Sequence, residues 1–110
     1  MPVDTQQRLL QELRERILVL EGPKGTMIQA EGLEDHDYRG KRFADHTIPL
    51  RNNNEMLNLV RPDLIESIHY RFAMAGADIV ATNTFNGNAI TVMMVSVFMM
   101  RLRLLLTLLR

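Results

Sequence analysis

The stretch RPDLIESIHYRFAMAGADIVATNTF, residues 61–85, decides the predicted fold of this 110-residue chain. Its first part predicts a helix, because Pro62 suits a first helical turn and Gly76 suits a C-terminal cap. An apolar stripe recurs at helical spacing and is formed by Leu64, Ile65, Ile68, Phe72 and Ala75. The apolar run ADIV follows at once and predicts a strand buried on both faces.

A second apolar run lies upstream in RILVLEG, residues 16–22, and ends at Glu21 and Gly22. It predicts another buried strand. Before it, residues 3–17 (VDTQQRLLQELRERI) predict a leading helix with leucines on one face. The order helix, strand, helix, strand predicts an α/β fold with two parallel strands and one right-handed crossover helix.

Residues 34–56 (EDHDYRGKRFADHTIPLRNNNEM) separate the first strand from the crossover helix and show no sustained period. They predict a long polar loop, and loops of this length in compact domains are usually functional.

Polar residues follow both predicted strands, as EGPKG at 21–25 and TNTFNGN at 82–88. Ligands of parallel α/β folds bind at the carboxyl ends of the strands. We therefore expect a site for a small polar ligand where these two segments meet. Many strands end in polar loops without a function, and the pattern alone leaves both interpretations open.

The three histidines form no catalytic or metal-binding spacing. His36 stands between Asp35 and Asp37, but adjacent residues rarely converge on one ion, so a solvated loop is favoured. His46 is an isolated loop residue. His69 lies on the predicted crossover helix beside the apolar stripe, which favours a partly buried structural imidazole. The absence of cysteine excludes disulfides and thiolate ligation of a metal within this chain.

The overall composition excludes several other classes. The formal net charge is zero, which gives no electrostatic case for nucleic-acid binding. The polar N-terminal stretch MPVDTQQRLLQELRER lacks the apolar region of a secretory signal, so a cytoplasmic location is expected. The segment EGPKGTM lacks the spacing of a phosphate-binding P-loop.

Taken together, the motifs GTMIQ, RGKRFADH, RPDLIESIH and AGADIVATNTFN resemble the homocysteine-binding domain of cobalamin-dependent methionine synthases, within the homocysteine S-methyltransferase family. The resemblance runs over residues 8–90 in one order. It implies part of a (β/α)8 barrel and a parent activity that transfers a methyl group from methylcobalamin to homocysteine, giving methionine. It also implies zinc and cobalamin as the cofactors of the family and homocysteine as the partner.

The resemblance implies that homocysteine's amino-acid part is held at the ends of the first two strands. The matching positions are Glu21, Gly22, Thr82, Asn83 and Thr84. It implies no catalytic residue and no metal ligand in this chain, because the family's zinc is held by three cysteine thiolates from later strands.

Four residues depart from the family's usual pattern. The first strand closes with EGPKGT where the family has DGGMGT, so Glu21, Pro23 and Lys24 differ in size or charge. Ala81 replaces a carboxylate before the sequence TNTF. With two strands of the eight that such a barrel needs, the chain is expected to be a truncated fragment, inactive by itself.

The last 20 residues, 91–110 (TVMMVSVFMMRLRLLLTLLR), differ in character from residues 1–90. They predict an apolar C-terminal helix. A change of reading frame near residue 90 would explain them, because Met93–Met94 read one frame back encode an aspartate. The alternative is a small non-enzymatic α/β protein whose tail associates with membranes, although Arg101 and Arg103 disfavour spanning. Self-association through this tail is also expected.

Overall fold

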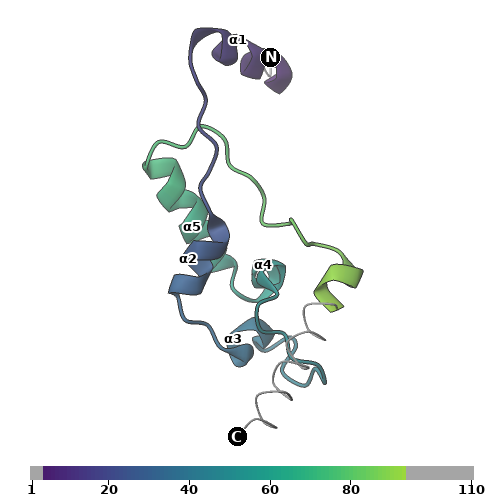
Figure 1. Ribbon diagram of the computed structural model, residues 1–110. Coiled ribbons are helices and arrows are strands. Elements are labelled where there is room, and N and C mark those ends of the chain that lie inside the picture. Colours follow the sequence, from purple (N-terminus) through teal and green to yellow (C-terminus); the bar gives the residue numbers. More distant parts are fainter. Residues whose placement is uncertain (1–3, 94–110) are drawn as a thin grey trace, which may run out of the picture.

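The computed structural model describes residues 4–93, and its regular elements are helices (Figure 1). In chain order the labelled ones are α1 (Thr5–Glu15), α2 (Lys24–Ala30), α3 (Asp35–Arg39), the 3₁₀ helix η1 (Asn54–Met56), α4 (Leu57–Val60) and α5 (Pro62–Met74). Residues 89–93, at the end of the described chain, are also helical.

The predicted fold class, an α/β fragment of a (β/α)8 barrel with two parallel strands, is wrong for the described residues. Residues 4–93 contain no strand. The two segments predicted as strands touch through a single isolated parallel bridge between Leu20 and Ile79. Hydrogen bonds from Glu21 N to Ile79 O at 2.8 Å and from Ile79 N to Val19 O at 3.2 Å form the bridge, and Asp78 N also donates to Val19 O at 2.8 Å.

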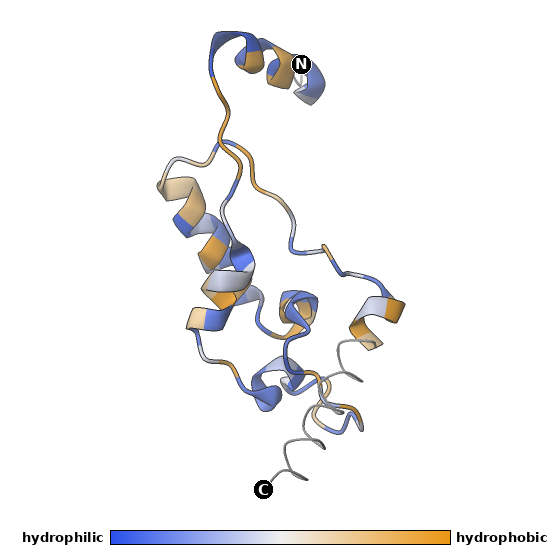
Figure 2. Ribbon diagram, viewed as in Figure 1, coloured by the Kyte–Doolittle hydropathy of each residue, from blue (hydrophilic) through white to orange (hydrophobic). Residues whose placement is uncertain are grey.

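The absence of a sheet in this part of the chain has a physical reason. Parallel strands are normally covered on both faces, and an isolated pair of strands is marginal in water. Here Val19 is 54% exposed, Leu20 is 64% exposed and Val80 is 46% exposed. Figure 2 shows hydrophobic colour along both extended segments where they run side by side. The apolar runs predicted strands buried on both faces, but no neighbouring element among the described residues covers these side chains.

The two helices predicted from local signals are present. The expected leading helix is α1, whose N-cap Asp4 accepts a hydrogen bond from the backbone of Gln6. The expected crossover helix is α5, with Pro62 in its first turn. Gly76 follows α5 with a φ of +108°, a conformation that glycine adopts without strain.

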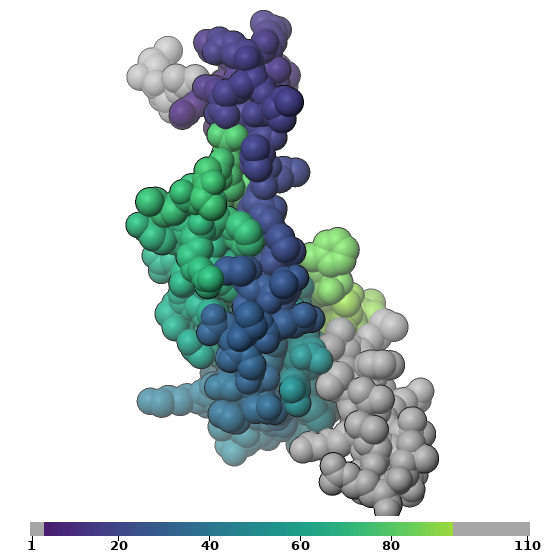
Figure 3. Space-filling model, turned by 60° about the vertical axis from the view of Figure 1, so that its left-hand side comes forward, coloured from purple at the N-terminus to yellow at the C-terminus, as the bar shows by residue number. Residues whose placement is uncertain are grey.

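The hydrophobic core lies among α2, α3, α4 and α5. Its buried members are Ile28, Tyr38, Leu50, Leu57, Leu64, Ile65 and Ile68. Helix α1 contributes no buried residue. It stands at one end of the molecule (Figure 3), joined to the rest by extended chain (Figure 1). An ion pair between Arg16 and Asp78, at 2.9 Å, connects the end of α1 with the segment after α5.

The predicted polar loop at residues 34–56 is in fact partly helical, because it contains α3 and η1, and it is folded around one carboxylate. Asp35 accepts hydrogen bonds from the backbone N–H groups of Leu50 at 2.7 Å and Arg51 at 3.0 Å, and from the guanidinium of Arg39. Desolvation raises the pKa of Asp35, but these hydrogen bonds outweigh it and hold the pKa below its usual range. Much of this segment is therefore held in a defined conformation between α2 and α4.

The predicted apolar helix at residues 91–110 falls almost entirely outside the described residues. Within residues 4–93, no helix combines the length and hydropathy needed to cross a membrane.

Candidate functional site

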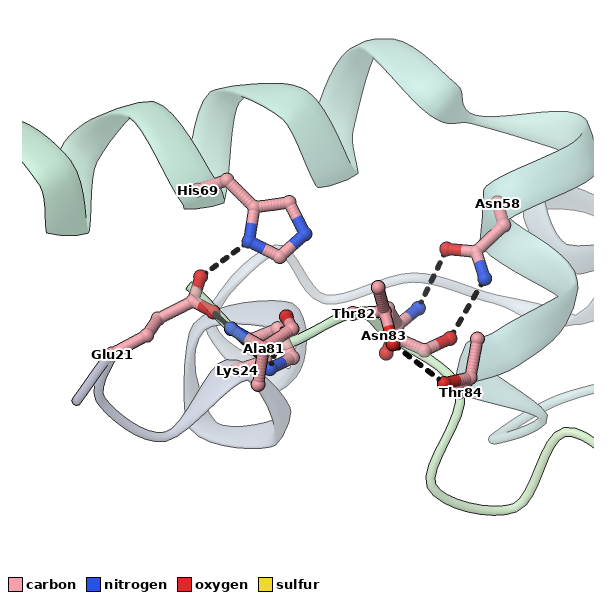
Figure 4. Close-up of polar contacts among 8 residues, drawn as sticks. All are labelled: Glu21, Lys24, Asn58, His69, Ala81, Thr82, Asn83 and Thr84. Atoms are coloured by element: carbon pink, nitrogen blue, oxygen red, sulfur yellow. Dashed lines mark hydrogen bonds and ion pairs between the residues drawn. The ribbon is translucent and has the colours of Figure 1, made fainter. Parts of the chain in front are cut away.

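The single bridge brings together the two polar segments that follow the apolar runs. Residues 21–24 lie beside residues 81–84, next to the middle of α5 (Figure 4). The expected meeting of these segments is therefore found, although no sheet carries them.

Glu21 is at the centre of this meeting point, and its side chain is completely shielded from solvent, at 0% exposure. One carboxylate oxygen, Oε1, accepts a hydrogen bond from Nδ1 of His69. The other, Oε2, accepts from the backbone N–H of Ala81 at 3.0 Å and from Nζ of Lys24 at 3.3 Å. Three separate segments thus supply donors to one buried carboxylate.

These partners determine the charge of Glu21. Desolvation by burial raises its pKa, because a charged group is less stable away from water. Hydrogen bonds from His69, from Lys24 and from the Ala81 backbone act in the opposite direction and prevail, so the pKa lies below its ordinary value. At neutral pH Glu21 is a buried, ionised carboxylate.

Lys24 connects the two segments directly. Its ammonium lies 3.3 Å from Oε2 of Glu21 and 3.1 Å from the backbone oxygen of Ala81. Its side chain is only 17% exposed. Lys24 is the first residue of α2, directly after the extended Pro23, and this position turns its side chain back toward Glu21.

His69 is the functional candidate whose role the sequence did not reveal. It was expected to be a partly buried structural imidazole, and its side chain is indeed 24% exposed. Its contact with Glu21, 48 positions away in the chain, was not predicted. The sequence did hold one indication of this position. His69 lies between Ile68, which is in the core, and Phe72, which packs against the core, so its side chain starts near the packed side of α5.

Gly22 allows α5 to approach the end of the first extended segment. A Cβ atom added at Gly22 would lie 2.4 Å from Cε1 of Phe72, well inside van der Waals contact. The missing side chain thus lets the aromatic ring reach the backbone next to Glu21.

Asn83 is buried and anchors the second polar segment to the short helices. Its Nδ2 donates to the backbone oxygen of Asn54 at 2.9 Å and to Oδ1 of Asn58 at 3.0 Å, and Asn58 donates back to the Asn83 backbone oxygen at 2.7 Å. The side chain of Asn83 is thereby committed to holding its own segment in place (Figure 4).

Thr82 and Thr84 flank Asn83, and both are exposed. Their hydroxyl oxygens lie 2.7 Å apart. The structure therefore places Glu21, Gly22 and residues 82–84 in one region, with Glu21 and Asn83 buried and the two threonines open to solvent. Their roles in binding homocysteine remain predictions.

The donor set does not fit the zinc site implied by the resemblance. The sequence has no cysteine, and no group of three histidine, aspartate or glutamate residues converges within residues 4–93. The side chain of His36 is exposed, as expected, and lies 3.5 Å from Asp37, but the residue belongs to α3 and not to the loop that the sequence predicts. A thiolate-held metal therefore has no ligands in this chain.

The buried carboxylate and the polar segment facing it lie within a stretch that has known relatives. A sequence profile described as homocysteine S-methyltransferase matches residues 18–103, which is well over half of the chain. The matched stretch begins just before Glu21 and includes α5 and the segment at 81–84. The chain therefore belongs to the homocysteine S-methyltransferase family.

Proposed function

We propose that residues 21–22 and 82–84 bind the amino-acid part of homocysteine. The parent activity would be methyl transfer from methylcobalamin to the sulfur of homocysteine, giving methionine. The family match supports the substrate class. The motifs RGKRFADH and AGADIVATNTFN support the cobalamin-dependent branch by resemblance.

One observation carries the proposal, namely the ionised carboxylate of Glu21, which accepts from the Ala81 N–H directly before the exposed segment Thr82–Thr84. An α-amino acid presents an ammonium group and a carboxylate close together. A carboxylate is the natural acceptor for the ammonium, and hydroxyl groups can donate to the ligand's carboxylate. Glu21 would take the first role, and Thr82 with Thr84 would take the second.

In this proposal the chain's own residues bind and orient the substrate. Activation of the thiol by a thiolate-held zinc would need ligands that this sequence does not contain. The chain alone, supplied with zinc, homocysteine and methylcobalamin, should yield no methionine above background.

Calorimetric titration of the full chain with L-homocysteine tests the binding role. Glu21→Gln keeps the shape of the side chain but removes its charge. We expect it to weaken binding roughly tenfold or more, because hydrogen bonds to charged groups contribute about 1.5–3 kcal/mol.

Glu15→Gln, on the exposed surface of α1, is the matched control and should bind like the wild type. Equal affinities for Glu21→Gln and the wild type would contradict the proposed role of Glu21.

A further inference from the structure

We propose that Lys24 is an internal counter-ion that occupies the position an incoming ammonium group would take at Glu21, so that an amino-acid ligand must displace it. This inference rests on the proposed function of Glu21. It assigns Lys24 as a residue that limits affinity for ligands carrying an amino group.

The contacts of Lys24 are those an ammonium ligand would make. Its Nζ lies within hydrogen-bond distance of Oε2 of Glu21, at 3.3 Å, and of the backbone oxygen of Ala81, at 3.1 Å. An ammonium group has three donors in a compact arrangement, and two of them are used here. The same carboxylate cannot offer this position to a ligand while Lys24 fills it.

Of the groups that contact Glu21, Lys24 can leave most easily. The Ala81 N–H belongs to the backbone, and the imidazole of His69 is carried on a short side chain from the middle of α5. Lys24 reaches the carboxylate through a flexible four-carbon stem. Rotation of that stem would expose Oε2 without movement of the backbone.

Displacement exchanges one ammonium for another, so loss of the Lys24 contact offsets part of what the ligand gains at Glu21. Removal of the lysine charge leaves the buried carboxylate of Glu21 without one of its partners. An ammonium group of a ligand would then take the place of that partner. The effect should be specific for ligands with an amino group, because an analogue without one does not compete with Lys24.

Calorimetric titration of the full-length chain tests the inference. The variants are Lys24→Met and Lys24→Gln, and the ligands are L-homocysteine and 4-sulfanylbutanoate, which is homocysteine without its amino group. We expect both variants to bind L-homocysteine about fivefold more tightly than the wild type, the size of a modest ion pair. Affinity for 4-sulfanylbutanoate should not change.

Lys41→Met is the matched control, because Lys41 is the other lysine of the chain and is exposed. It should bind both ligands like the wild type. Lys24→Gln retains an N–H donor for the Ala81 oxygen, so it remains informative if Lys24→Met loses helical circular dichroism.

The outcomes separate this inference from the proposed function. If the Lys24 variants bind L-homocysteine no more tightly than the wild type, the role of Lys24 is overturned. If Glu21→Gln still weakens binding in that case, the proposed function stands alone. If Glu21→Gln binds L-homocysteine like the wild type, or if no protein binds L-homocysteine, both the inference and the proposed function are overturned.

Discussion

Glu21 is the residue on which the polar groups around the candidate site converge. Its carboxylate accepts from the side chains of His69 and Lys24 and from the Ala81 backbone, and it is shielded from solvent. Substitutions at this residue should therefore affect both stability and ligand binding.

The lowered pKa of Glu21 predicts a specific acid sensitivity. In the unfolded chain its pKa is near 4.5, and in the folded chain it is lower. A depressed folded-state pKa contributes stability that is fully present above the unfolded value and is lost as the pH falls through the folded value. Between about pH 6 and about pH 3, the wild type should lose more free energy of unfolding than Glu21→Gln.

Urea denaturation at the two pH values measures this difference. Other carboxylates with lowered pKa, such as Asp35, are present in both proteins and cancel in the comparison. Equal losses in the two proteins would show that Glu21 is not held in its ionised form by its partners.

The close contact between Gly22 and Phe72 predicts that a larger residue at position 22 lowers stability. In Gly22→Ala the new Cβ would lie 2.4 Å from the ring of Phe72. The ring would have to move out of its packing against the core, and overpacking of this kind costs typically about 1–3 kcal/mol. Urea denaturation should show a loss of that size.

Gly25→Ala is the matched control for Gly22→Ala. It lies in α2, and an added Cβ there meets nothing within 4 Å. Alanine at a helical glycine should be neutral or stabilising by up to about 1 kcal/mol. A Gly22→Ala variant as stable as Gly25→Ala would mean that Phe72 does not pack on the glycine.

Among the elements, the connection at residues 34–56 depends on Asp35. Its carboxylate holds the backbone of Leu50 and Arg51 against α3 and also pairs with Arg39. Asp35→Ala leaves those N–H groups without this acceptor, and we expect a loss of about 2 kcal/mol in the free energy of unfolding.

Asp45→Ala, an exposed change in the same connection, should alter stability by less than about 0.5 kcal/mol. Chemical denaturation of both variants gives the comparison. If Asp35→Ala were as mild as Asp45→Ala, the connection would not be organised by this carboxylate.

The elements that could be predicted are those whose signals are local. Helix α5 was predictable because Pro62, the apolar stripe and Gly76 all lie within one short window. Helix α1 was predictable for the same reason. The strands were not, because a strand exists only with a partner and a covering layer. The runs at 17–20 and 78–80 form one bridge, and most of their apolar side chains stay exposed.

The site could be predicted to a similar extent. The sequence indicated that EGPKG and TNTFN would lie together, and the bridge between Leu20 and Ile79 places them so. It could not show that His69 and Lys24 would converge on Glu21. That contact depends on how α5 is rotated about its axis and on the conformation of the turn before α2, and both are set by tertiary packing.

On the scale of the whole molecule, the chain is extended and its core is small. The Cα radius of gyration is 18.0 Å, against about 13 Å for a compact chain of similar length. Apolar side chains stay exposed along the bridged segments, among them Ile17 at 89% and Leu20 at 64%. The candidate site nevertheless lies where the start of α2, the middle of α5 and both extended segments meet.

The most direct test of the account is a nuclear magnetic resonance titration of the isotope-labelled full chain with L-homocysteine, observed through its backbone amides. We predict that the amides that shift most cluster at residues 21–24 and 81–84, and that Glu21→Gln needs roughly tenfold more L-homocysteine, or more still, to reach the same shifts. Shifts that fall elsewhere, or that persist unchanged in Glu21→Gln, would contradict the assignment of this region as the homocysteine site.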